Sequence, residues 1–231
     1  MNASRVGRHG AMELRMLLRN GEQLLLTFAI PLGLLVGGLI WGAGFGLDPV
    51  TFPASVVAVA TWSTAFTAIA VGTGFERRYG VLERLVATPL TRADLIAGKA
   101  LAACALVALQ AVLLIAVSAG LGWRPVWSLA GASSAALGTL LGIAAFAGLG
   151  LLLAGNLKAE VTLALANLVY LAGLTLGGLL LDQAPVLPTA ALGSLMREAA
   201  NGAAAPLALL ILAAWAAALT LLARRYFRWT S

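Results

Sequence analysis

The sequence predicts an all-α integral membrane protein with six transmembrane helices, an N-terminal interfacial amphipathic helix and a cytoplasmic hairpin between the second and third spans. Apolar residues make up 61% of the 231 positions and charged residues only 10%, whereas a soluble domain carries about 25% charged residues. The apolar residues form long stretches, and the basic residues behind the net charge of +6 lie in short clusters between them. So few charges could not cover a water-soluble surface. Scattered basic clusters also fit the rim of a membrane protein better than a groove for nucleic acid, so no nucleic-acid partner is expected.

Residues 9–23 show the periodicity of an amphipathic helix. Leu14 and Leu17 fall on one side of the helix, and Arg15 and Arg19 fall on another. This pattern predicts a helix lying in the membrane surface. A plain cytoplasmic extension of the first span is the alternative.

Six stretches contain about the 20 apolar residues that a helix needs to cross about 30 Å of hydrocarbon. They are predicted at residues 24–44, 53–75, 96–121, 129–155, 161–181 and 206–223. Residues 1–231 are therefore predicted to form a single transmembrane domain in the lipid bilayer.

The basic residues orient these spans, because the cytoplasmic loops of membrane proteins are enriched in lysine and arginine. With the N-terminus inside, the inside segments hold 13 of the 15 basic residues, and the outside segments hold only Arg124 and Arg197. This distribution predicts a multi-pass protein with both termini in the cytoplasm.

Residues 76–95 form a charged cytoplasmic segment between the second and third predicted spans. Leu82 and Leu85 lie on one side of a short predicted helix, while Glu83 and Arg84 face away from it. The segment is longer and more charged than a minimal connection needs. A docking surface for a cytoplasmic partner and a solvated loop both remain open on composition alone.

The same segment contains a helix stop and a helix start. Pro89 ends the first helix, because the residue before a proline avoids the helical region. Thr91 is predicted to cap the next helix, with Asp94 completing a capping box. The sequence therefore predicts a helix–break–helix hairpin.

Residues 182–205 form the longest predicted outside segment. Pro185 and Pro188 interrupt it, yet it is too apolar for a free loop. It is predicted to be an extracellular loop or a set of re-entrant helices, since irregular backbone at membrane depth must be buried in protein or face water.

The chain itself is predicted to be non-catalytic and to hold no cofactor. A phosphate-binding loop needs G-x-x-x-x-G-K-[ST], and the only candidate, Gly98-Lys99, is followed by Ala100. Lys99 is instead interpreted as an anchor at the inner interface. Because His9 is the one histidine, no histidine-rich metal site is predicted.

Neutral polar and aromatic side chains lie within the second and fifth predicted spans, and one interpretation is that they line a substrate path. Helix–helix hydrogen bonding, worth about 1 kcal/mol each or less, is the alternative. The path candidates are Trp62, Ser63, Phe66, Thr67, Asn167 and Tyr170.

A motif in the hairpin resembles a known family. Residues 76–92 read Glu-Arg-Arg-Tyr-Gly-Val-Leu-Glu-Arg-Leu-Val-Ala-Thr-Pro-Leu-Thr-Arg, and Gly98-Lys99 follow. This string is similar to the signature loop between the second and third of six spans in type-two ATP-binding-cassette (ABC) permeases, with Val81 in place of the usual threonine. The likeness extends over essentially the whole chain and is closest to the bacterial drug and antibiotic exporter branch.

The resemblance implies the permease subunit of an ATP-driven exporter in the bacterial cytoplasmic membrane. Its substrate would be hydrophobic or amphipathic, such as a drug, an antibiotic or a lipid. The implied partners are two ABC ATPase subunits, which would bind ATP and Mg²⁺, and a second permease copy, identical or related. Coupling to the ATPase is expected at Glu76, Arg78, Gly80, Leu82, Glu83, Arg84, Leu85 and Pro89.

Two other classes of function remain open from the sequence. A self-sufficient secondary carrier or channel would transport without an ATPase. A membrane scaffold would have no transport path.

Overall fold

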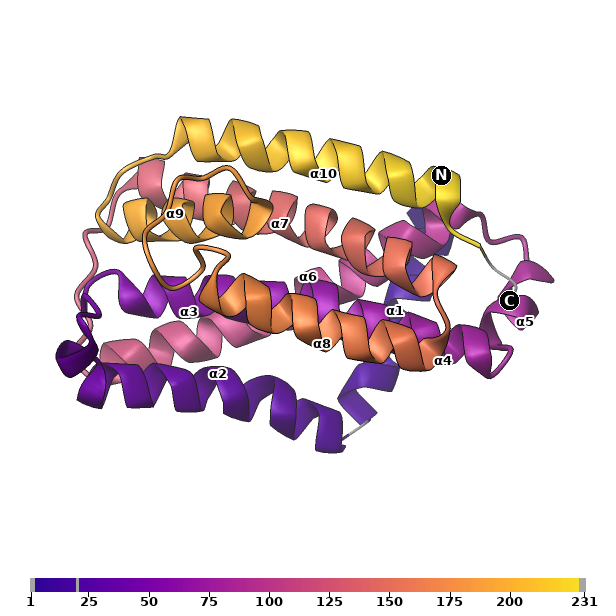
Figure 1. Cartoon of the computed structure of the whole chain (residues 1–231), viewed down its shortest axis with the longest axis horizontal. Coiled ribbons are helices and arrows are strands. Elements are labelled where there is room, and N and C mark those ends of the chain that lie inside the picture. The colour runs from indigo at the N-terminus through magenta and orange to yellow at the C-terminus, as the bar shows by residue number, and fades with distance from the viewer. Residues whose placement is uncertain (1–2, 20, 229–231) are drawn as a thin grey trace.

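The computed structural model describes residues 3–19 and 21–228, and every regular element in these ranges is helical. The all-α prediction is therefore confirmed for this part of the chain. The long helices run roughly along one axis (Figure 1). The helices in chain order are α1 (Ala3–Arg19), α2 (Gly21–Trp41), α3 (Phe52–Trp62), α4 (Ile69–Arg78), α5 (Val81–Val86), α6 (Arg92–Gly120), α7 (Leu129–Asn156), α8 (Ala159–Thr175), α9 (Pro188–Ala200) and α10 (Pro206–Tyr226), with a 3₁₀ turn η1 (Gly42–Phe45) and a π-helical segment η2 (Ser63–Ala68).

Within the described ranges, five helical segments are long and apolar enough to cross a bilayer. They are Thr27–Phe45, Phe52–Arg78, Arg92–Gly120, Leu129–Asn156 and Pro206–Tyr226. These segments coincide with five of the six predicted spans, and they make the chain a multi-pass membrane protein.

The remaining predicted span, 161–181, is only partly helical. Helix α8 has 17 residues, so at 1.5 Å per residue it is about 25 Å long, below the roughly 30 Å of a hydrocarbon core. The helix ends at Thr175, and three residues later the chain turns at Gly178, where φ is +72°, a conformation that glycine adopts without strain. Arg197 Nη1 then donates to the carbonyl of Leu179 at 3.1 Å. By helix length, the described residues contain five spans and one shorter apolar helix.

Helix α7 lies at the centre of the bundle and contacts α3, α4, α6, α8, α9 and α10. Its closest neighbour is α10. A Cβ added at Gly148 would lie 2.8 Å from the carbonyl carbon of Leu219, so only glycine allows the two backbones to come this close. Small residues at such contacts are the usual means of packing helices in lipid, where no hydrophobic force draws them together.

The second span, α3–η2–α4, is the most enclosed, with 72% of its apolar window buried against 17% for α2. Its π-helical segment η2 places Thr64 beside Gln110, whose Oε1 accepts from Thr64 Oγ1 at 2.9 Å. Gln110 Nε2 in turn donates to the carbonyl of Thr27 at 2.9 Å. A buried polar chain therefore joins α2, η2 and α6 in the middle of the membrane-spanning region. Such π-helical segments are rare and occur frequently at functional sites.

Segment 182–205 was expected to be an extracellular loop or a set of re-entrant helices. It contains α9, whose first residue is Pro188. Leu192 and Leu195 are fully buried, and α9 packs against α3, α7 and α10. Helix α9 is therefore part of the bundle's interior packing, whereas most of residues 182–187 are exposed.

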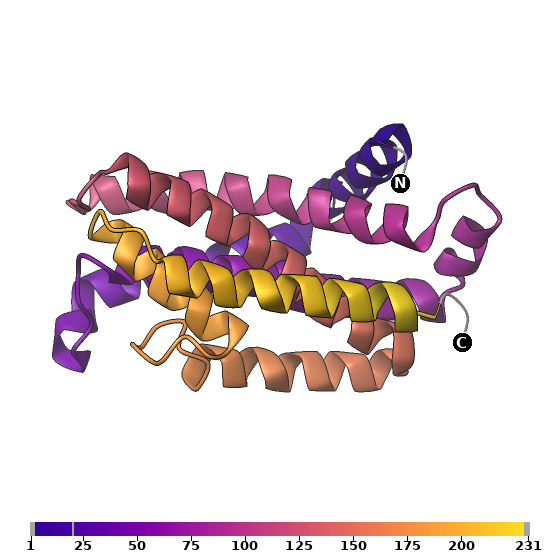
Figure 2. The ribbon, with the colours of Figure 1, turned by 90° about the horizontal axis from the view of Figure 1, so that it is seen from above.

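Helix α1 leaves the bundle at an angle (Figure 2) and packs on the start of α6. It begins at Ala3, earlier than the predicted 9–23; Asn20 lies outside the described residues. The buried face consists of His9, Gly10 and Glu13, while the apolar Met16 remains exposed. The helix therefore turns a polar face to the protein, and the position of its apolar side in the membrane surface stays a prediction.

Both ends of the described chain lie at the same end of the bundle as α5 (Figure 1). Arg124 and Arg197, the two basic residues expected outside, belong to the loop before α7 and to α9, at the other end. The bundle thus has one strongly basic end, which we call the hairpin end.

The close approach of α7 and α10 predicts the effect of a single methyl group. Gly148→Ala must push apart two backbones, so we expect it to destabilise the fold by about 1–3 kcal/mol, the usual cost of overpacking. The thermal unfolding midpoint in detergent would measure this. Gly120→Ala is the matched control, because a Cβ at Gly120 meets nothing within 4 Å; equal midpoints for the two variants would contradict the packing described.

Candidate functional site at the hairpin end

The hairpin between α4 and α6 is built from two turns and a short helix. Gly80, with φ +69°, reverses the chain after α4 and leads into α5. After α5 the chain passes Pro89 and reaches Thr91, which accepts from the Asp94 backbone N–H while Asp94 Oδ2 accepts from the Thr91 backbone N–H. The predicted capping box is therefore present, and α6 begins at Arg92.

The hairpin is held to the bundle along one side. Leu82 is fully buried and belongs to the main apolar core, and Leu85 packs partly against the same core. From α1, Arg5 Nη1 donates to the carbonyl of Pro89 at 2.7 Å. Leu82 and Leu85 therefore support the hairpin from within.

The other side of the hairpin faces solvent. Glu83, Arg84 and Pro89 are exposed, and neither Glu83 nor Arg84 forms an ion pair within residues 3–19 and 21–228. Glu83 and Arg84 thus present two opposite charges to solvent, and neither charge is used for an ion pair among the described residues.

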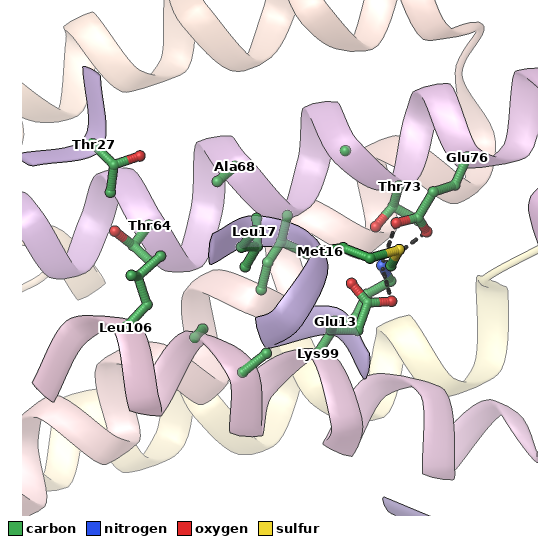
Figure 3. A pocket seen from close by; sticks show the side chains of 14 residues that line it. Glu13, Met16, Leu17, Thr27, Thr64, Ala68, Thr73, Glu76, Lys99 and Leu106 are labelled. Atoms are coloured by element: carbon green, nitrogen blue, oxygen red, sulfur yellow. Dashed lines mark hydrogen bonds and ion pairs between the residues drawn. The ribbon is translucent and has the colours of Figure 1, made fainter. Parts of the chain in front are cut away.

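Behind the hairpin, a buried ion cluster joins three helices (Figure 3). Lys99 of α6 is 4% exposed. Its Nζ lies 2.9 Å from Glu13 Oε1 of α1 and 2.9 Å from Glu76 Oε1 of α4. Charges withdrawn from water in this way are stable only when paired, so each helix depends on the other two for its position.

The structure therefore corrects the interpretation of Lys99 and refines that of Glu76. Lys99 is an internal bridge, whereas the sequence suggested an interface anchor. Glu76, expected among the coupling residues, directs its carboxylate to Lys99 and not to the exposed face of the hairpin. Sequence reasoning missed Glu13 altogether, since a glutamate on an amphipathic helix is ordinarily on the wet face.

The crossing of α1 and α6 explains how the cluster can form. A Cβ at Gly98 would lie 2.4 Å from His9 Cδ2, and one at Gly10 would lie 3.1 Å from the Gly98 carbonyl oxygen. The missing side chains at Gly10 and Gly98 let the helices approach until Glu13 reaches Lys99. In the sequence, Gly10 and Gly98 are the residues from which this close crossing could have been inferred.

His9 borders the cluster, with Nε2 3.4 Å from Glu13 Oε1. Burial lowers the pKa of His9 below its usual 6.5; the Glu13 carboxylate opposes this shift and the Lys99 ammonium reinforces it. The imidazole is therefore neutral at pH 7, and Lys99 is the one cation within the cluster.

Arg77 and Arg78 extend the connections to α7 and α8. Arg77 Nη1 donates to the Ala154 carbonyl at 3.1 Å, at the C-terminal end of α7, where unpaired carbonyls attract cations. Arg78 forms an ion pair with Glu160 at the start of α8. Arg78, one of the expected coupling residues, is thus half-exposed and already has a partner.

The residues expected to line a substrate path separate into two groups. Trp62 and Phe66 are fully enclosed, stacked on one another with centroids 4.2 Å apart, and Trp62 Nε1 donates to the Tyr170 carbonyl at 3.3 Å. Ser63 and Tyr170 are half-buried. Thr67 is half-buried and Asn167 is exposed on α8. Within one chain, therefore, the two aromatic rings form core packing.

Comparison with known proteins places this geometry in context. The sequence matches the family described as ABC-2 type transporter over residues 11–207, a range that includes the ion cluster, the hairpin and α9. Comparison with curated proteins gave no match.

The ion cluster predicts a strongly non-additive set of substitutions. Lys99→Met leaves two carboxylates buried without a cation, so we expect a loss of about 3–5 kcal/mol of stability. Adding Glu13→Gln and Glu76→Gln to Lys99→Met should restore much of that loss, because no uncompensated charge remains. Thermal unfolding in detergent would measure both. Lys158→Met, at the exposed second lysine, is the control, and a triple variant less stable than Lys99→Met would contradict the pairing.

The neutral state of His9 predicts a pH dependence. Because the His9 pKa is lowered in the folded state, the unfolded chain binds a proton more readily as the pH falls below 6.5, and the free energy of unfolding decreases. The free energy of unfolding should stop decreasing once the pH is below the pKa of His9 in the folded protein. We expect His9→Gln to lose less stability than the unmodified chain between pH 7.5 and 5.5, measured by thermal midpoints. Identical slopes would show that His9 does not titrate in this way.

Proposed function

The chain belongs to the ABC-2 type transporter family and is a membrane permease of an ABC transporter, and we propose that it forms the export path of a bacterial efflux complex. The single observation that supports this proposal is the hairpin. It presents free opposite charges at Glu83 and Arg84 on its exposed side, and its other side is joined to the bundle through Leu82 and the Lys99 cluster. This arrangement suits a surface that receives force from a separate protein.

We propose two ABC ATPase subunits as that partner, since this chain has no phosphate-binding loop. ATP and Mg²⁺ would be held by the ATPase subunits. Each would contact Glu83, Arg84 and Pro89, with Gly80 and Pro89 setting the angle of the hairpin. Arg78 and Glu76 would transmit the movement, Arg78 to α8 through Glu160 and Glu76 to α1 and α6 through Lys99. Binding of ATP at one site and rearrangement of the spans at another would then be linked as two states of one complex.

We further propose that two permease copies, identical or related, act together, with α8 as a sixth span in each. The 17% burial of α2 and the exposure of Asn167 on α8 support this proposal. An amide facing lipid would lack hydrogen-bond partners, whereas a second copy or a substrate path would supply them. Ser63, Thr67, Asn167 and Tyr170 would border that path, with Trp62 and Phe66 packed behind them. An apolar path of this kind suits a hydrophobic or amphipathic substrate.

We place the hairpin end in the cytoplasm, with both termini on that side of the bacterial cytoplasmic membrane. The excess of basic residues at this end supports the orientation.

The docking surface predicts a charge-reversal effect. We expect Glu83→Lys to reduce recovery of the ATPase with the permease about tenfold or more, because a like charge facing its partner costs several kcal/mol. The measurement is affinity purification of the tagged chain from native membranes, with attached subunits quantified by mass spectrometry.

The matched control is Glu198→Lys, the same reversal at an exposed glutamate of α9 at the opposite end of the bundle. If Glu83→Lys and Glu198→Lys recover equal amounts of ATPase, the hairpin is not the docking surface. If the unmodified chain recovers no ATPase and transports alone when reconstituted, the protein is a secondary carrier or a channel.

A further inference from the structure

A cavity of about 230 Å³ lies in the corner between α1, α2, η2, α4 and α6 (Figure 3). One buried water needs only about 10–15 Å³ of such volume, so the cavity can hold a larger molecule. Neither the hairpin surface nor the proposed substrate path makes use of it.

The two ends of this cavity differ in polarity. At the hairpin end it is lined by Glu13, Thr73, Glu76 and Lys99. Seven residues farther along α6, about 10 Å at 1.5 Å per residue, it is lined by Leu106 together with Thr27 and Thr64 (Figure 3). The Thr64 hydroxyl at this end already donates to Gln110. Ala68, Ile69, Ala102 and Ala103 make up much of the wall between. A charged end near the membrane surface and an uncharged, mostly apolar end deeper match the way an amphiphile stands in one leaflet.

The polar end favours a cation. Two carboxylates share one ammonium, Lys99, and His9 is neutral at pH 7. An ionised carboxylate has about four acceptor positions, and Glu13 is bonded to Lys99 through Oε1 alone. Thr73, fully buried, has a hydroxyl with no hydrogen-bond partner among the described residues, and it lines the cavity. An ammonium group placed here would donate an N–H to the Thr73 hydroxyl and balance the negative charge that the second carboxylate adds.

We propose that this cavity binds an amphiphile whose primary ammonium group lies beside Glu13, Thr73 and Glu76 and whose apolar chain extends toward Leu106. The ligand is either a lipid with an amino headgroup or a soluble cationic amphiphile. The proposal is independent of the ATPase and of the direction of transport, so its test uses the purified chain alone.

The test measures binding of decylammonium by the shift in thermal midpoint and by calorimetry, in a maltoside detergent that carries no ammonium group. We expect saturable binding of decylammonium and none of decyl sulfate, which has the same chain and the opposite charge. Methylammonium, the head without the chain, should bind far more weakly. Equal binding of decyl sulfate and decylammonium would overturn the proposal.

Two variants separate the site from unspecific uptake into the micelle. Gly72 lines the cavity and a Cβ there meets nothing within 4 Å, so Gly72→Leu fills the cavity without altering a charge and should abolish binding. Glu76→Gln should weaken binding about tenfold, the effect of losing one hydrogen bond to a charged group. Gly120→Leu and Glu198→Gln are the controls and should bind as the unmodified chain does. Binding that survives Gly72→Leu would contradict the proposal even if Glu76→Gln failed to fold.

The source of the ligand follows from the lipids that copurify from native membranes, identified by mass spectrometry. An amino lipid retained by the unmodified chain and lost from Gly72→Leu identifies a lipid headgroup. Decylammonium binding without any retained amino lipid identifies a soluble amphiphile.

Discussion

The ammonium group of Lys99, enclosed with two carboxylates, is the interaction on which the rest of this structure depends. Its partners, Glu13 and Glu76, come from different helices and lie 63 positions apart in the sequence. A buried charge without a partner costs far more than the pair contributes, so the three helices cannot separate one at a time. The surface helix α1, the second span and the third span are thus made into one mechanical unit at the end of the bundle that carries the hairpin.

This unit extends in two directions. Toward the exposed side, Leu82 and the bond from Arg5 to the Pro89 carbonyl fix the hairpin to the same three helices. Toward the membrane interior, α4 continues into the π-helical segment η2, where Thr64 and Gln110 connect it to α2. A displacement of the hairpin therefore has a continuous path of packed and hydrogen-bonded groups into the centre of the spans.

Much of this fold could be predicted from the sequence, because length and apolarity determine spans and local chemistry determines turns. The apolar runs located all five long spans, and Thr91, Asp94 and Pro89 were sufficient to place the hairpin's break and the start of α6. The end of α8 was not predictable by hydropathy, since Leu179 and Leu180 continue the apolar run after the helix has ended at Thr175.

The site was harder to predict than the fold, because it depends on which helix crosses which. Periodicity predicted an apolar side of α1 for the membrane surface, but it did not identify the side that contacts the protein, which uses His9, Gly10 and Glu13. The cause is the close crossing with Gly98, a tertiary feature that a single helical pattern does not contain. The motif around Glu76 and Lys99 was recognisable, but the pairing of these two residues with Glu13 required the structure.

The most direct test of the mechanical unit is the distance between α1 and the hairpin in the assembled complex. Spin labels at Ala11→Cys and Ala87→Cys, two exposed alanines, in a Cys104→Ala background would report it by pulsed electron resonance. With the labelled permease diluted by unlabelled copies, the account predicts one narrow distance within a copy that is the same in nucleotide-free and ATP-trapped complexes and that broadens in Lys99→Met. A distance that changes with nucleotide in the unmodified protein, or that stays narrow in Lys99→Met, would contradict it.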